Sequence, residues 1–166
     1  MCAGGAANQA IALARLGAPV RLHSRVGVDQ MGVFVDEMLA REGVDTSSCE
    51  RVGDQNVTVS LSFDGDRAMT TRGTTALPLL GGDAPGCLLA DVRGIGANSE
   101  VVSSWRARGT WVLVDTAWDE AGAWDEADLE ALHLADVCTP NEEEALAYAR
   151  TESVEDAARW FASFGC

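Results

Sequence analysis

Apolar residues recur at helical spacing in the first part of the chain. Alanine, isoleucine and leucine positions three or four apart predict a helix over 6–16, which ends at Gly17. The segment 18–27, APVRLHSRVG, places Val20 and Leu22 two apart and predicts a strand. Asp29 predicts the N-cap of a second helix, which closes at Gly43. The predicted apolar face of this helix consists of Met31, Phe34, Val35, Met38 and Leu39.

Strict alternation replaces this pattern at 57–63, VTVSLSF, where every second residue is apolar. Such a period of two predicts a half-buried strand. The residues DGDR at 64–67 predict a turn, and RAMTTRG at 67–73 predicts the returning strand of a hairpin. We therefore interpret the region of about 44–73 as a small lid-like β insertion and not as a layer of the main sheet.

Helix and strand alternate again in the second half. The pattern predicts a helix over 101–108, a buried strand over 110–115, a helix over 126–132 and a short strand within 135–140. Two more helices are predicted, the first with Thr139 as N-cap, Pro140 at the first helical position and Glu142 completing a capping box. The second begins after Ser153 and covers 154–164. This alternation predicts an α/β domain with a mostly parallel sheet.

The charge and the cysteines narrow the class of protein. The chain of 166 residues has a formal net charge of −14 and contains no lysine, which argues against a nucleic-acid partner and excludes a Walker-type phosphate lysine. No apolar run approaches the length of a membrane span, so we expect no membrane partner and a cytoplasmic location. The five cysteines are widely spaced, which predicts free buried thiols in a reducing compartment.

Gly4, Gly5 and Asn8 form the first candidate site. Glycines allow a ligand to approach the backbone closely, and the N–H groups at a helix start can donate to a ligand oxygen. The Asn8 amide can both donate and accept, as a hydroxyl ligand requires. An ordinary helix with a glycine-rich N-terminus would look the same, so both interpretations stay open.

Asn141 and Glu144 form the second candidate site, three residues apart near a helix start. They follow the carboxyl end of a strand, where open α/β sheets bind ligands, and their oxygens suit Mg²⁺ held through water. The alternative is helix capping alone. Asp115 also ends a strand and either faces a ligand or caps the next loop.

GIGANS at 94–99 begins like a dinucleotide-binding fingerprint. Its sixth position is Ser99 where the fingerprint has glycine, and no strong strand is predicted before it. The segment therefore argues against a NAD-dependent oxidoreductase.

Taken together and in order, these segments resemble the PfkB/ribokinase family of carbohydrate kinases. The resemblance rests on GGAANQAIALARLG at 4–17, RVGVDQMG at 25–32, LAREGVDTS at 39–47, the hairpin at 57–73, LVDTAWDEAGAW at 113–124 and ADVCTPNEEEA at 135–145. It implies a three-layer, Rossmann-like fold with helices on both faces of the sheet, together with a lid that often pairs two subunits into a homodimer. It also implies ATP-dependent phosphorylation of a sugar hydroxyl with Mg²⁺.

The resemblance assigns roles residue by residue. It implies that Gly4, Gly5 and Asn8 hold substrate hydroxyls, that Asn141 and Glu144 organise Mg²⁺ and phosphate mainly through water, and that Asp115 lies near substrate or phosphate. The family's first strand is expected before Gly4 and its catalytic Asp beyond Cys166, so no catalytic base is assigned. We accordingly expect residues 1–166 to be a partial kinase domain, truncated at both ends and inactive alone. The alternative is a non-catalytic sugar-binding remnant or a partner-dependent half of a kinase.

Overall fold

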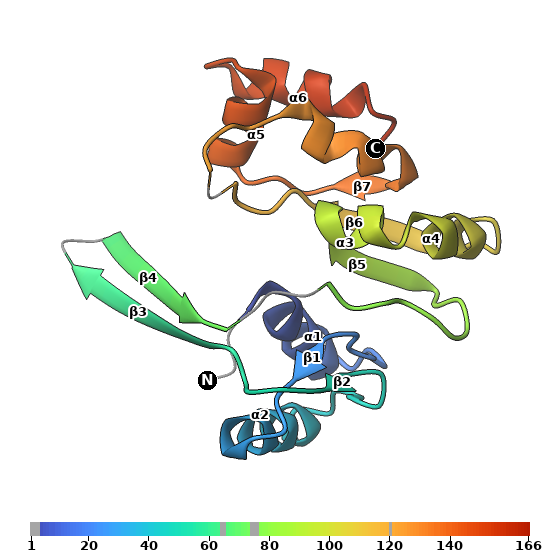
Figure 1. Cartoon of the computed structure of the whole chain (residues 1–166). Helices are drawn as coiled ribbons and strands as arrows, with labels where there is room; N and C mark the ends of the chain where they lie inside the picture. Colours follow the sequence, from blue (N-terminus) through green and yellow to red (C-terminus); the bar gives the residue numbers. More distant parts are fainter. Residues whose placement is uncertain (1–3, 64–65, 74–76, 120) are drawn as a thin grey trace. The chain divides into compact units, whose positions relative to one another are not determined.

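The computed structural model describes residues 4–63, 66–73, 77–119 and 121–166. These residues form two compact units, Met1–Pro78 and Leu79–Cys166, and each is described by itself (Figure 1). The predicted turn residues Asp64 and Gly65 and one of the predicted free thiols, Cys2, lie outside the described residues. None of the helices in these ranges is long and apolar enough to cross a membrane.

The first unit begins with two helices and two short strands. Helix α1 spans Gly5–Arg15, strand β1 Arg25–Val26, helix α2 Gln30–Arg41 and strand β2 Glu50–Arg51. Strands β1 and β2 pair in parallel, and the Asp29 carboxylate caps α2 as predicted by accepting from the Gly32 N–H at 2.8 Å. Their shared core consists of Ala10, Leu22, Val26, Leu39, Val44 and Cys49.

The predicted apolar face of α2 is only partly buried. Leu39 is buried and Val35 and Met38 are packed against the core, whereas Met31 and Phe34 are about half exposed. The spacing correctly places these side chains on one side of the helix, but the described core lies against the C-terminal part of that side. Helical periodicity identifies a face and does not say how far along the helix that face is covered.

The hairpin forms as predicted. Strand β3 spans Val57–Phe63 and β4 spans Asp66–Arg72, and they pair antiparallel from Val57 opposite Arg72 to Phe63 opposite Asp66. The prediction that β3 is half-buried is wrong, because all seven of its residues are exposed. Alternation fixes which side chains share a face, but burial also requires an element to cover that face, and none of the described elements does so.

The second unit is built on a parallel sheet. Strands β5 (Cys87–Asp91), β6 (Trp111–Asp115) and β7 (Val137–Cys138) lie side by side in that order. Two helices follow β5, α3 over Val92–Ala97 and α4 over Ser99–Arg106, and two follow β7, α5 over Glu142–Ala149 and α6 over Val154–Ala162. The predicted mostly parallel α/β architecture is confirmed (Figure 1).

Side chains from most of these elements meet in one core. The core contains Val92, Ile95, Val102, Val112, Val114, Leu129, Leu132, Tyr148 and Phe161. The helix predicted over 126–132 is a 3₁₀ segment, η1, over Glu126–Leu134. Strand β5 was not predicted, because CLLAD is short, lacks alternation and is defined mainly by its pairing with β6. The segment GIGANS therefore does follow a strand, but it lies within α3 and the start of α4.

The cysteine prediction is wrong for one pair. Cys138 and Cys166 form a disulfide with their Cα atoms 5.8 Å apart. Cys49 is free and buried as predicted, whereas Cys87 is free but exposed. Sequence separation hid the pair, because β7 and the residues after α6 are brought together only by the fold of the intervening helices.

Candidate functional site

The six candidate residues fall into two groups. Gly4, Gly5 and Asn8 belong to the unit Met1–Pro78. Asp115, Asn141 and Glu144 belong to the unit Leu79–Cys166. The structure brings together the members of each group, and each group is described within its own unit.

The first group lies at the start of α1. Gly4 is the N-cap residue with a φ of 117°, a conformation that residues with a side chain rarely adopt, and its carbonyl accepts from the Asn8 N–H at 3.0 Å. Gly5 has no such backbone requirement, and a Cβ placed on it would meet no other atom within 4 Å. Gly4, Gly5 and Asn8 are all exposed. The packing of this unit therefore does not explain why residue 5 is a glycine. The absence of a side chain at this position leaves the first turn of α1 accessible to a ligand.

Two aspartates lie together at the carboxyl ends of neighbouring strands. Asp91 ends β5 and Asp115 ends β6, and the parallel register pairs them. The Asp91 carboxylate caps α3 by accepting from the Gly94 N–H at 2.6 Å. Burial is the main cause of the raised pKa of the Asp115 carboxyl; the backbone N–H groups of Ala117 and Thr116 oppose it, and the charges of Glu144 and Asp91 add to it. Asp115 thus sits in a negative, partly desolvated position.

Asn141 and Glu144 form a reciprocal capping box at the start of α5. The Asn141 side-chain oxygen accepts from the Glu144 N–H at 2.9 Å, and Oε2 of Glu144 accepts from the Asn141 N–H at 3.3 Å. The predicted N-cap Thr139 is wrong, because Asn141 holds that position and the Thr139 hydroxyl instead donates to the Val114 carbonyl at 3.4 Å. The capping interpretation of this pair is therefore correct, and a ligand can contact only the side-chain atoms that the cap does not use.

The two oxygens of Glu144 are used differently. The Thr116 hydroxyl donates to Oε2 at 2.7 Å, and both residues are buried. Within the described part of the chain, Oε1 receives no hydrogen bond. Because the cap uses the Asn141 oxygen, the Asn141 NH₂ group takes no part in the cap and keeps its capacity to donate. One acceptor and one donor of the pair thus remain for a ligand.

The loop after β6 holds a buried carboxylate that sequence reasoning missed. Asp119 accepts from the Trp124 N–H at 2.8 Å and from the Ala121 N–H at 3.0 Å. The bond from Trp124 is the main cause of the lowered pKa of Asp119. Trp124 packs edge-on against Trp118 and Tyr148, with ring centroids 4.9 and 5.1 Å apart. Asp119 and Trp124 are therefore held together, and Trp124 in turn packs on Tyr148 of α5.

The donor chemistry of this region suits a hydrated cation. The described residues contain no group of three or more His, Cys, Asp or Glu side chains that could enclose a metal ion. The available groups are Oε1 of Glu144 and the partly buried Asp115 carboxylate, which are oxygen acceptors. Mg²⁺ prefers oxygen and usually keeps several of its waters, so these residues fit a metal held chiefly through water.

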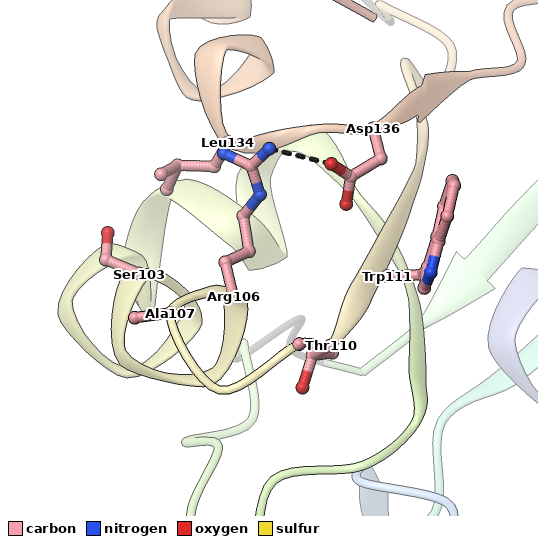
Figure 2. A pocket seen from close by; sticks show the side chains of 8 residues that line it. Ser103, Arg106, Ala107, Thr110, Trp111, Leu134 and Asp136 are labelled. Carbon is pink, nitrogen blue, oxygen red and sulfur yellow. Dashed lines mark hydrogen bonds and ion pairs between the residues drawn. The ribbon is translucent and has the colours of Figure 1, made fainter.

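A separate cavity of about 500 Å³ opens at the amino end of β6 (Figure 2). Arg106 crosses it to Asp136 at 2.7 Å, and the second Asp136 oxygen accepts from the Val112 N–H at 2.8 Å. The Arg106 guanidinium is the main cause of the lowered pKa of Asp136. Because these charges already satisfy one another, we interpret the pair as a structural link between α4 and the residue before β7. Asp115 lies at the other end of the same strand.

Comparison with known sequences identifies relatives of the N-terminal part. The profile of the pfkB family carbohydrate kinases matches residues 1–76. The 2-dehydro-3-deoxygluconokinase of Bacillus subtilis (strain 168) is 46% identical over 56 residues, which cover 34% of this chain and 17% of that enzyme.

Comparison with solved structures extends the likeness to almost the whole chain. The PfkB protein from Polaromonas sp. JS666 matches 96% of this chain and 62% of its own, with a TM-score of 0.80 and 22% identity. A Vibrio cholerae O395 fructokinase with fructose, ADP and calcium ion bound matches 98% of this chain and 60% of its own, with a TM-score of 0.76 and 25% identity. The chain thus spans less than two thirds of the length of each relative named here.

Proposed function

We propose that this chain is part of a pfkB-family carbohydrate kinase, an enzyme that transfers the γ-phosphoryl group of ATP to a sugar hydroxyl. The observation that carries this proposal is the fold match to the fructokinase with fructose, ADP and calcium ion bound, over 98% of this chain. In such reactions the protein contributes mainly by positioning the reactants and neutralising phosphate charge.

The start of α1 would hold the sugar. The first N–H groups of α1 have no partner within the helix, and Gly5 leaves them approachable. We assign Gly4 and Gly5 to backbone contacts with substrate hydroxyls and the Asn8 amide to a side-chain contact. The panel of candidate substrates consists of ribose, fructose, 2-keto-3-deoxygluconate and nucleosides.

The start of α5 would face the phosphates. We assign Oε1 of Glu144 to the water shell of Mg²⁺, and the Asn141 NH₂ group to a phosphate oxygen. Mg²⁺, when bound, would supply charge neutralisation along the phosphates. Asp115 would lie near substrate or phosphate, where its raised pKa makes it sensitive to added positive charge.

We further propose that the enzyme is a homodimer and that it is cytoplasmic. The exposed apolar face of β3 would pair two subunits into a homodimer through the hairpin. We also propose a cytoplasmic location, where ATP and phosphorylatable sugars are available.

A second candidate is a non-catalytic sugar-binding protein or one half of a kinase that requires a partner. It is favoured by the extent of the match, because the chain spans only about 60% of the fructokinase and no residue in it is assigned as the catalytic base. Under either candidate we expect this chain alone to bind sugar without turning over ATP.

A binding assay and a turnover assay on the 166-residue chain test these proposals. The expected result is a thermal shift with at least one sugar of a panel, lost in Asn8→Leu and kept in Gln9→Leu, whose residue lies one position further along α1. No shift with any sugar would contradict the role of the α1 start. A coupled ADP assay with Mg²⁺ and each sugar is expected to show no release above background. Sugar-dependent ADP release would refute the expectation that the chain is inactive alone.

A further inference from the structure

The hydrogen bond between Thr116 and Glu144 joins two elements that are far apart in sequence. Thr116 directly follows β6 and Glu144 lies in the first turn of α5, 28 residues later. Thr116 is 2% exposed and Glu144 is 5% exposed, so water does not compete strongly for this bond. Hydrogen bonds from a neutral hydroxyl to a buried carboxylate are short and strong, as the distance of 2.7 Å indicates.

This bond fixes the orientation of the Glu144 carboxylate. Oε2 also accepts a hydrogen bond from the Asn141 N–H, but that bond is longer, at 3.3 Å, and comes from the N-cap residue of the same helix. With both donors on one oxygen, the carboxylate plane cannot turn without breaking the buried bond, and within the described residues the second oxygen, Oε1, accepts no hydrogen bond. Without the hydroxyl, the carboxylate plane could turn about its last torsion, whose preference is broad, so neither oxygen would keep a fixed position.

We propose that Thr116 is a positioning residue for Glu144. Its hydroxyl fixes Oε2 so that Oε1 is presented to the water shell of the bound cation. This inference rests on the proposed function, in which Glu144 organises that cation. It adds a residue from the end of β6 that acts through Glu144 and does not itself touch the ligand.

The test is Mn²⁺ binding to the 166-residue chain, measured from the electron paramagnetic resonance signal of free Mn²⁺. Thr116→Val keeps the shape of the side chain and removes the hydroxyl, and we expect it to weaken Mn²⁺ binding about tenfold. Thr116→Ser restores a hydroxyl and is expected to stay close to the unchanged chain. Glu144→Gln is expected to abolish the specific binding.

Thr110→Val is the matched control. The Thr110 hydroxyl is also buried and donates to the Pro85 carbonyl at 2.6 Å, but it lies just before the amino end of β6. The two Thr→Val variants should lose similar stability in urea, and only Thr116→Val should lose Mn²⁺ affinity. Equal Mn²⁺ affinity in both, with Glu144→Gln inactive in binding, would overturn the role of Thr116 and leave the proposed function standing. No Mn²⁺ binding by the unchanged chain, or binding that survives Glu144→Gln, would overturn both.

Discussion

At the scale of single residues, the charge of the Asp115 carboxylate, a candidate ligand, lowers the stability of the folded chain. Burial and the charges of Glu144 and Asp91 raise the pKa of its carboxyl. A carboxyl with a raised pKa binds its proton more tightly in the folded chain, so stability falls as pH rises above the unfolded value of about 3.9. The penalty is complete once the pH exceeds the folded pKa. Carboxylates that destabilise the free protein are typical of sites that bind a positively charged ligand.

We therefore predict that Asp115→Asn stabilises the chain at neutral pH. The amide oxygen can still accept from the Ala117 N–H, and the unfavourable charge is gone. The expected gain is about 0.5–1 kcal/mol in the free energy of unfolding, measured by urea denaturation. The gain should shrink towards zero as the pH is lowered, because the Asp115 carboxyl then becomes protonated.

Asp83→Asn serves as the control for this substitution. Asp83 is exposed in the segment before β5, so the same change of charge is made outside the site. Its effect on stability at neutral pH should be small. A loss of stability in Asp115→Asn at neutral pH would contradict the interpretation of Asp115 as an unfavourable charge.

The sequence revealed site residues only where their partners are local. Asn141 and Glu144 could be identified because they lie three residues apart at a predicted helix start, although the capping box itself was predicted two residues too early. Thr116 could not, because its partner is 28 residues away and becomes a neighbour only when β6 and α5 are assembled. Asp119 offered a weaker local signal, since its bonds to the N–H groups of Ala121 and Trp124 form a short turn.

At the scale of elements, the hairpin carries an apolar face that nothing in the described chain covers. Val57, Val59, Leu61 and Phe63 lie on one side of β3, and all are more than a third exposed. A contiguous exposed apolar face of this kind favours association. We predict that the chain self-associates and that Leu61→Lys weakens the association by at least about tenfold in dissociation constant, measured by sedimentation equilibrium.

Ser60→Lys provides the comparison on the other face of the same strand. Ser60 pairs with Met69, whereas Leu61 pairs with Ala68, so the two substitutions introduce the same charge on opposite sides. Only the Leu61 variant should dissociate. Equal weakening by both lysines would point to charge repulsion, and a monomeric unchanged chain would exclude association through this face.

Element types were predicted well where a local pattern defines them. The helix α2, the hairpin and the strand β6 were found from periodicity and capping. Strand β5 was missed, because it depends on what it packs against, and the helix expected over 126–132 forms as the 3₁₀ segment η1. Burial was the least predictable property, as the exposed β3 shows. The pattern of a strand does not indicate whether another element covers its apolar face.

At the scale of the whole molecule, the disulfide and the tryptophans lie in the same unit. Cys138 and Cys166 close a loop that contains α5, α6 and both Asn141 and Glu144. All five tryptophans, at positions 105, 111, 118, 124 and 160, belong to Leu79–Cys166. Tryptophan fluorescence therefore reports on this unit alone, whereas far-ultraviolet circular dichroism reports on helices and strands of both units.

We predict that reduction destabilises the unit Leu79–Cys166 selectively. Opening a loop with a sequence separation of 28 removes a constraint on the unfolded chain that is worth about 3.5 kcal/mol in the chain-entropy account. Adding a phosphine reductant should lower the urea midpoint of the fluorescence transition, with a smaller change in the dichroism.

Cys138→Ala should reproduce this shift without reductant, and Cys87→Ala, which alters a free exposed thiol, should not. A fluorescence midpoint unaffected by reductant would show that the disulfide does not constrain this unit. Since a reducing cytoplasm would keep the pair as thiols, the reduced chain is the one whose sugar and Mn²⁺ binding bears on the proposed kinase.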